Sequence, residues 1–333
     1  MSTRNCLVLG AAGFLGSAME HRLKAEGAYV VSVARKLPPL RPSVADKYVI
    51  CDLTNVPEFH YHFYHYTFDE VYQFASDSGG IGYIANSDND AAIMTNSLKI
   101  NLYTLEAIVR TGHANKIFFA SSQCVYPASP PIDPFANERL TSPVHEFRES
   151  DASFDNFAFA KEKLFSEALY DAYRRNHGLT IRIGRLGNTY GPFCRLDDDR
   201  AKAPAAICRK VAEAPYAGSI RLWGNGSQIR TFTYVDDAIE GIRRLMDVDY
   251  QHPVNISSRE AVTISELLDA VCHAAGKIIG FEPEDRPTGV HARSSDNSLA
   301  LEVLGWEPTT PLIEGICKLY TWVSQQVLNQ KVA

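Results

Sequence analysis

The chain has 333 residues, of which 45% are hydrophobic and 22% charged, and its formal net charge at pH 7 is −6. These values are typical of a globular protein with a sizeable core, and the negative charge argues against binding to nucleic acid or to an anionic membrane. No stretch approaches the roughly 18 continuous apolar residues of a membrane span, and we see no signal peptide. The seven cysteines include no C-x-x-C pair, which argues against a disulfide framework or a zinc ribbon. We therefore predict a cytoplasmic protein.

A glycine motif follows the first predicted strand, residues 6–9. Gly10, Gly13 and Gly16 stand between this strand and a helical pattern that Phe14 and Leu15 open. Strand, G-x-x-G-x-x-G and helix together predict a dinucleotide-binding turn, in which the backbone approaches a pyrophosphate at the helix N-terminus. We expect all five residues to contact the cofactor.

The end of the second predicted strand, residues 29–34, bears on which nicotinamide cofactor binds. An acid at this position bonds the ribose 2′-hydroxyl of NAD, whereas an arginine accommodates the 2′-phosphate of NADP. The chain has Arg35 and Lys36 there, which favours NADP. After a third strand, residues 48–51, we expect Asp52 and Leu53 to meet the adenine.

Three histidines, His60, His62 and His65, alternate with aromatic residues beyond the third strand. A metal site needs such a cluster to converge with a carboxylate, so the alternation favours a surface segment instead, and we predict no metal. A fourth strand, residues 71–75, ends at Ala75, a further predicted cofactor contact. Gly79 opens a glycine-rich stretch, residues 79–82, that we expect to be a flexible loop. A long helix is predicted over residues 86–111.

The fifth predicted strand, residues 117–119, leads into a small polar stretch that ends at Pro127. In an open α/β sheet, ligands collect just outside the carboxyl ends of the strands. The Ser122 hydroxyl and the Cys124 thiol, two residues apart at such an end, are therefore candidates for chemistry. The alternative is a small-residue strand end followed by a buried cysteine.

A second long helix, residues 158–177, places Phe159 and Lys163 one turn apart on the same face. After a sixth strand, residues 180–185, the regular alternation of strands and helices ends. This alternation predicts a Rossmann-type doubly wound parallel sheet in a dinucleotide-binding domain, residues 1–187. Residues 188–333 predict a smaller mixed α/β substrate domain, from which residues 230–258 return to the first domain. Its predicted helices are residues 203–214, 263–275, 297–304 and 312–328, and residues 223–226 form a turn between short strands.

Five runs carry a resemblance that covers essentially the whole chain. They are S-S-Q-C-V-Y-P, R-I-G-R-L-G-N-T-Y-G-P-F, K-A-P-A-A-I-C-R-K, W-G-N-G-S-Q-I-R-T-F-T-Y-V-D and H-A-R-S-S-D-N. With them the chain resembles the extended short-chain dehydrogenase/reductases, the nucleotide-sugar epimerases and dehydratases. Within this family it is most similar to the GDP-mannose 3,5-epimerases.

The resemblance implies a nucleotide-sugar epimerase with a tightly bound, recycled NAD or NADP. In the family, hydride leaves the sugar C4 for the nicotinamide while a tyrosine takes the hydroxyl proton, and the resulting ketone acidifies C3–H and C5–H. Carried over, Ser122 bonds the C4 oxygen, Cys124 is the base and Lys202 the acid. Lys163 holds the nicotinamide ribose. The residues that hold the GDP-sugar are then Gly79, Gln123, Asn188, Lys210, Gln228 and Arg293.

The chain departs from the family at the catalytic tyrosine, where Phe159 stands in Y-x-x-x-K. Starting the motif at Phe157, with Lys161, also gives phenylalanine, and the Lys163 register aligns the following helix better. Phenylalanine fills the same space and lacks only the hydroxyl. This predicts an inactivated Tyr→Phe form, natural or engineered, and the otherwise intact site favours an engineered one.

Three interpretations remain open at this point. One is an epimerase of a GDP-linked sugar that inverts C3, C5 or both. Another is a 4-epimerase of a different or larger nucleotide sugar, in which Cys124 and Lys202 only shape the pocket. The third is a binding protein that has lost its tyrosine. The resemblance also implies a homodimer formed through the two long helices, residues 86–111 and 158–177.

Overall fold

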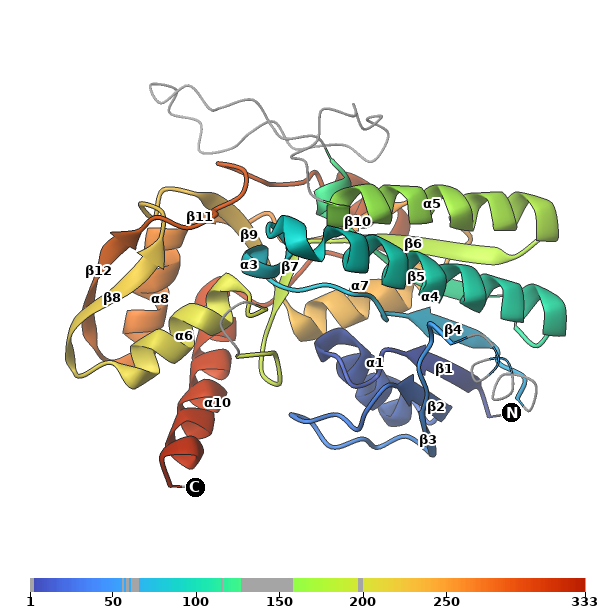
Figure 1. Cartoon of the computed structure of the whole chain (residues 1–333), viewed down its shortest axis with the longest axis horizontal. Coiled ribbons are helices and arrows are strands. Elements are labelled where there is room, and N and C mark those ends of the chain that lie inside the picture. Colours follow the sequence, from blue (N-terminus) through green and yellow to red (C-terminus); the bar gives the residue numbers. More distant parts are fainter. Residues whose placement is uncertain are drawn as a thin grey trace.

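A computed structural model describes residues 3–55, 57, 60, 66–114, 116–126, 158–196 and 200–332. Its larger part is built on a seven-stranded parallel sheet with the order β10-β6-β5-β4-β1-β2-β3 (Figure 1). The order reverses between β1 and β4, and ligands of such sheets bind at this switch point, outside the carboxyl ends of the strands. The strands are β1 (Asn5–Leu9), β2 (Tyr29–Ala34), β3 (Lys47–Ile50), β4 (Glu70–Gln73), β5 (Lys116–Ser122), β6 (Thr180–Leu186) and β10 (Val254–Ile256).

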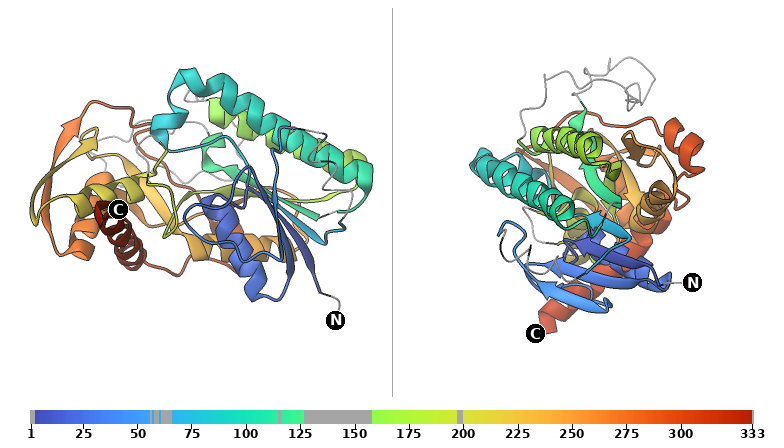
Figure 2. Two further views of the ribbon diagram at one scale, coloured as in Figure 1. Left: turned by 60° about the horizontal axis from the view of Figure 1, so that its bottom comes forward. Right: turned by 90° about the vertical axis from the view of Figure 1, so that its right-hand side faces the viewer.

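Helices cover both faces of this sheet (Figure 2). Helices α1 (Phe14–Ala25) and α7 (Val235–Asp247) lie on one face, and α4 (Asp90–Thr111) and α5 (Ala158–His177) lie side by side on the other. Cys6 and Val8 of β1 join the core under α1 and α7, whereas Leu7 and Leu9 join the core under α4 and α5. Because both faces are buried, the strands are continuous apolar runs, as expected for a parallel sheet.

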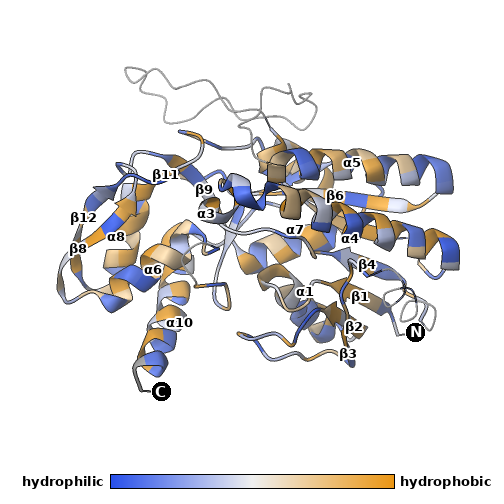
Figure 3. Ribbon diagram, in the orientation of Figure 1, coloured by the Kyte–Doolittle hydropathy of each residue, from blue (hydrophilic) through white to orange (hydrophobic). Residues whose placement is uncertain are grey.

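The smaller part of the molecule combines two short sheets with three packed helices. The mixed sheet has the order β11-β9-β7, and β8 pairs with β12 in parallel. Helices α6, α8 and α10 pack against one another beside them. The exposed C-terminal turns of α5, in the larger part, are hydrophilic in Figure 3. The bounds are β7 (Asn188–Tyr190), α6 (Ala203–Glu213), β8 (Ala217–Trp223), β9 (Ile229–Tyr234), β11 (Ala261–Thr263), α8 (Ile264–Ala275), β12 (Ile278–Glu284), α9 (Ser298–Leu304) and α10 (Leu312–Val332).

The predicted fold class is confirmed, with corrections in the details. The stretch expected to be a flexible loop, residues 79–82, is partly helical, because α3 spans Ile81–Ile84 and Gly80 is its N-cap. His60 is buried rather than part of a surface segment, and His62 and His65 lie outside the described residues. The sequence did not predict the parallel pair β8 and β12. Of residues 230–258, β10 joins the large sheet and α7 packs on its face, while β9 belongs to the three-stranded sheet.

Candidate active site

The glycine motif forms a tight turn between β1 and α1. Gly10 has φ +82°, a left-handed conformation, and a Cβ there would lie 2.7 Å from the backbone nitrogen of Ala75. A Cβ on Gly16 would lie 2.3 Å from the carbonyl oxygen of Gly10, so the helix closely approaches the strand. Gly13 is the N-cap of α1, and no side chain caps the first turn. Helix N–H groups left open at such a turn fit a pyrophosphate, and the residues present therefore fit a dinucleotide.

The other predicted cofactor residues lie at the same edge of the sheet. Arg35 is exposed directly after β2, and Leu53 is buried beyond β3. The carboxylate of Asp52 accepts hydrogen bonds from the Thr54 N–H at 2.9 Å and hydroxyl at 2.8 Å, so it shapes its own loop. Ala75 follows β4, and its N–H donates to the side chain of Gln73 at 2.8 Å.

The exposed Arg35 leads to a testable expectation on cofactor choice. With Arg35 and Lys36 where an acid would bond the ribose, we expect NADP to bind at least as tightly as NAD. Arg35→Asp should weaken NADP binding about tenfold or more, roughly 1.4 kcal/mol, and leave NAD binding intact or stronger. Calorimetric titration of both cofactors measures this. Lys47→Asp, an exposed lysine at the opposite end of β3, is the matched control. Tight NAD binding with none of NADP in the unaltered chain would contradict the expectation.

The first turns of α5 carry Phe159 and Lys163. The Lys163 side chain is buried, and its Nζ lies 5.0 Å from the ring centroid of Phe119 and 5.7 Å from that of Phe159. Its nearest carboxylate oxygen among the described residues is Oε2 of Glu162, at 3.8 Å. A lysine ammonium beside the ring at position 159 is the arrangement that would lower the pKa of a tyrosine hydroxyl there, but Phe159 has no hydroxyl.

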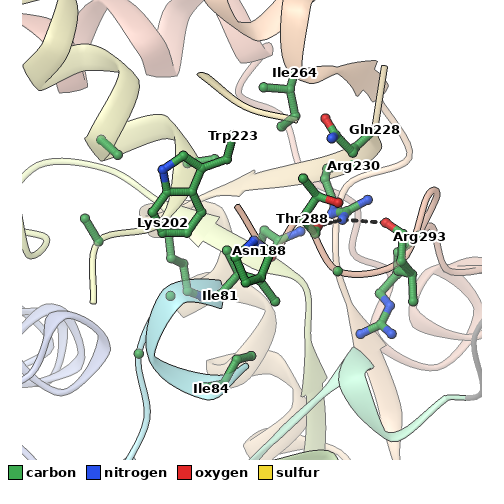
Figure 4. Close-up of a pocket in the computed structure, with 18 of the residues that line it drawn as sticks. Ile81, Ile84, Asn188, Lys202, Trp223, Gln228, Arg230, Ile264, Thr288 and Arg293 are labelled. Carbon is green, nitrogen blue, oxygen red and sulfur yellow. Dashed lines mark hydrogen bonds between the residues drawn. The ribbon is translucent and has the colours of Figure 1, made fainter. Parts of the chain in front are cut away.

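A cavity of about 650 Å³ opens where the two parts of the chain meet (Figure 4). Its volume is that of a small-molecule site. Four of the five predicted catalytic residues and all six predicted substrate residues line it, although they are up to 214 positions apart, from Gly79 to Arg293 (293 − 79). Lys163 lies outside the lining. The predicted residues in the lining are Gly79, Ser122, Gln123, Cys124, Phe159, Asn188, Lys202, Lys210, Gln228 and Arg293.

Ser122 and Cys124 enter the cavity from the end of β5. The strand stops at Ser122, whose Oγ accepts a hydrogen bond from the Cys124 N–H at 3.1 Å and so caps a short 3-10 turn, Gln123–Val125. Cys124 is half-buried, which corrects the alternative of a buried structural cysteine. The turn presents a hydroxyl and a thiol to the same space.

Lys202 approaches Cys124 from the other half of the chain. It is the N-cap of α6, and its side chain is accessible through the cavity while protein atoms surround it closely. Desolvation by these surroundings lowers the pKa of Lys202, and Coulomb attraction to Cys124 and Cys194 opposes this shift. A thiol on the same cavity as an amine, the Lys202 amine with its lowered pKa, is suited to proton removal and return.

Neutral side chains at the cavity are held by polar partners. Gln123 is buried, and its Nε2 donates to Oγ of Ser295. The Asn188 Nδ2 donates to the carbonyl oxygen of Thr231 at 3.2 Å. These bonds fix the Gln123 amide just after β5 and the Asn188 amide at the start of β7.

Lys210 and Gln228 supply further polar groups. The Lys210 Nζ donates to the carbonyl oxygen of Arg221 at 2.7 Å. Oε1 of Gln228 is buried and accepts no hydrogen bond from the described part of the chain. A buried acceptor without a donor in the protein is suited to a donor on a ligand.

Several lining residues were missed by sequence reasoning. Trp223 and Ile264 form an apolar wall of the cavity (Figure 4). Arg230 holds the segment that contains Thr288 and Val290, which also line the cavity. The Arg230 guanidinium donates to the carbonyl oxygens of Thr288 at 2.9 Å and Val290 at 2.7 Å. Both Trp223 and Arg230 belong to a run that carried the family resemblance, which was the available signal.

Among the described residues, no three His, Cys, Asp or Glu side chains gather closely enough to hold a metal ion. Within the same part of the chain, no helix combines the length and the apolar character that crossing a membrane requires.

Residues 6–257 match the NAD dependent epimerase/dehydratase family. The chain belongs to this family. GDP-mannose 3,5-epimerase of Arabidopsis thaliana is 35% identical over 97% of this chain and 83% of its own length. GDP-mannose 3,5-epimerase 1 of Oryza sativa subsp. indica is 34% identical over 97% of this chain and 82% of its own. The resemblance found in the sequence is therefore confirmed, and NAD is the cofactor of the family.

Solved structures share the fold at lower identity. UDP-glucose 4-epimerase of Thermotoga maritima superimposes with a TM-score of 0.80 at 21% identity, over 97% of this chain and 99% of that one. A Tyr→Phe variant of UDP-glucuronic acid 4-epimerase from Bacillus cereus superimposes with a TM-score of 0.78 at 23% identity, over 97% of this chain and 99% of that one. It was solved with UDP-4-deoxy-4-fluoro-glucuronic acid and NAD.

Proposed function

We propose that the protein is an epimerase of a GDP-linked hexose that inverts C3, C5 or both, with GDP-mannose as the first substrate to test. The observation that carries the proposal is the pair of Cys124 and Lys202 on one cavity, since a sugar 4-epimerase needs no such pair. The relatives at 34–35% identity over nearly the whole chain are GDP-mannose 3,5-epimerases, which supports the same substrate class.

Bound NAD would supply the means to oxidise the sugar at C4 and to reduce it again. The chain's own residues have the following roles. The Ser122 hydroxyl holds the C4 oxygen, and Lys163 holds the nicotinamide ribose. The Cys124 thiolate takes a proton from C5 or C3, and the Lys202 ammonium gives one to the opposite face, so the carbon is inverted. The thiol and the amine then exchange protons with water to restore the resting site.

Cationic and amide groups anchor the nucleotide end. Lys210 and Arg293 offset the diphosphate charge, and the buried Oε1 of Gln228 accepts a hydrogen bond from the substrate. Residues 1–187 with α7 and β10 form the cofactor half, and most of residues 188–333 form the sugar-nucleotide half.

Phe159 marks this chain as an inactivated form of such an enzyme, natural or engineered. The similar fold of the Bacillus cereus enzyme, in a Tyr→Phe form, holds NAD and a sugar nucleotide together. That precedent supports binding without fast turnover in this chain.

Product analysis tests the proposed function. GDP-mannose incubated with the Phe159→Tyr form should yield GDP-sugars inverted at C3, at C5 or at both, as followed at each carbon by NMR. Inversion at C4 alone would replace the proposal with the 4-epimerase. No inversion at any carbon, with tight sugar-nucleotide binding, would favour the binding protein.

The protein is proposed to be a cytoplasmic homodimer. All seven cysteines lie among the described residues and are free thiols, which suits a reducing compartment. The outer faces of α4 and α5 combine exposed small residues, Ala91 and Ala168, with Phe165, which is 57% exposed. A second copy of the same helix pair is the partner that such a face fits.

Phe165 offers a test of the dimer. Phe165→Glu places a charge on the proposed interface, and we expect it to convert the dimer to monomers. Sedimentation velocity measures this, with Tyr216→Glu, an exposed aromatic residue beside β8, as the control. A monomeric unaltered chain, or a dimer that survives the substitution, would contradict the proposal.

A further inference from the structure

Arg200 stands two residues before Lys202 and ties this segment to the loop after β4. Its Nη1 lies 3.5 Å from Oδ1 of Asp77 and donates to the carbonyl oxygen of Ser78 at 3.3 Å. Its guanidinium carbon lies 3.6 Å from the ring centroid of Tyr83, a cation–π contact. One side chain thus contacts the loop through charge, hydrogen bonding and stacking.

The backbone makes the same connection. The Gly80 N–H donates to the carbonyl oxygen of Arg200 at 3.0 Å. A Cβ on Gly80 would lie 2.2 Å from the carbonyl oxygen of Ala201, so only glycine permits this approach. The segment that leads into Lys202 is therefore in direct contact with the start of α3.

Asp77, the carboxylate that Arg200 contacts, is itself held in place by hydrogen bonds. Its Oδ1 accepts from the Tyr83 hydroxyl at 2.9 Å and its Oδ2 from Nδ2 of Asn96 at 2.9 Å. Its own N–H donates to Oγ of Ser97 at 3.0 Å. Asn96 and Ser97 lie in α4, which packs on the large sheet. Through Asp77, Arg200 is therefore held in a fixed position relative to the cofactor half of the molecule.

Lys202 lines the cavity together with Ile81 and Ile84 of α3 (Figure 4). Cys124, by contrast, comes from the end of β5 in the large sheet. We propose that Arg200, Asp77 and Tyr83 form a positioning cluster that fixes Lys202 relative to Cys124 and so sets the geometry of proton return. The cluster rests on the proposed function, and none of its three side chains lines the cavity.

The magnitude follows from the sensitivity of proton transfer to distance. A misplacement of about 1 Å can cost on the order of 10²-fold in rate. Arg200→Met, which keeps length and removes the guanidinium, should therefore slow proton exchange by about 10- to 100-fold. Binding of GDP-mannose should change less than about twofold, because the nucleotide contacts remain.

The experiment measures the two quantities separately. GDP-mannose affinity is measured by calorimetry in the unaltered chain and its Arg200→Met form. Solvent deuterium incorporation into the sugar is measured in the Phe159→Tyr form, with and without Arg200→Met. Arg110→Met, an exposed arginine at the end of α4, is the matched control. Tyr83→Phe, which removes only the hydroxyl bond to Asp77, is a milder second variant in case Arg200→Met does not fold, and Arg200→Lys should restore part of the rate.

The pH profile separates positioning from a general structural role. The protein atoms around Lys202 desolvate its ammonium and lower its pKa, opposed by Cys124 and Cys194. A Lys202 that moves away from these atoms toward solvent should therefore lose its ammonium only at higher pH. The alkaline fall of the exchange rate should accordingly move to higher pH in Arg200→Met. Affinity and rate that fall together, with an unmoved pH profile, would overturn the cluster.

The outcomes distinguish the two proposals. Deuterium uptake in Phe159→Tyr that Arg200→Met and Tyr83→Phe leave unchanged would reject the cluster and leave the function intact. An absence of uptake in Phe159→Tyr itself would reject the function, and the cluster with it.

Discussion

We expect Phe159→Tyr to raise turnover of the GDP-sugar by about 10²–10⁴-fold, the range of general acid–base catalysis by a placed side chain. Phe159 lines the cavity together with Ser122, and the Lys163 ammonium lies 5.7 Å from its ring centroid. A hydroxyl added to this ring would be acidified by Lys163 and would take the proton of the C4 hydroxyl. Substrate affinity should change little, because Lys210, Gln228 and the apolar wall are untouched.

Steady-state kinetics of the two forms decide the matter, together with calorimetric affinities. Phe165→Tyr adds the same hydroxyl to the exposed side of α5 and is the matched control, so it should leave the rate unchanged. Equal turnover by the unaltered chain and Phe159→Tyr would mean that another group takes the proton, and the tyrosine mechanism would fail.

The second large effect concerns Cys124 and Lys202. In the Phe159→Tyr background, Cys124→Ala and Lys202→Ala should each lower solvent deuterium uptake into the sugar by at least about 10²-fold. Each change removes one of the two groups that exchange protons on the cavity. Mass spectrometry of the recovered sugar nucleotide measures the uptake.

Two substitutions on α10, Cys317→Ala and Lys318→Ala, remove the same residue types away from the cavity and serve as controls. Unchanged deuterium uptake in both test variants would reduce Cys124 and Lys202 to pocket lining and favour the 4-epimerase. Because the pKa of Lys202 lies below the ordinary value of 10.5, its ammonium is lost as the pH rises through that lower pKa. The exchange rate should therefore begin to fall below pH 10.5.

The sequence alone determined the features that depend on neighbouring residues. The turn around Gly10 and Gly16 is specified by glycines at fixed spacing between an apolar run and a helical pattern, because only glycine permits those approaches. The parallel sheet followed from apolar runs such as β1, since strands buried on both faces need apolar side chains in both directions. Ser122 and Cys124 were candidates from their place at a strand end, the other catalytic and substrate residues came from the family resemblance, and the cavity brings nearly all of them together.

Tertiary structure alone decided what depends on distant partners. Strands β8 and β12 pair across about 60 positions, and neither strand carries a local sign of the other. The same holds for α3, whose docking on Arg200 and Ala201 turned an expected loop into a rigid wall of the cavity. The lowered pKa of Lys202 arises from desolvation at a cavity that segments far apart in the chain line together. Pairing, docking and desolvation depend on which surfaces meet when the chain closes, and local patterns of residues do not carry that information.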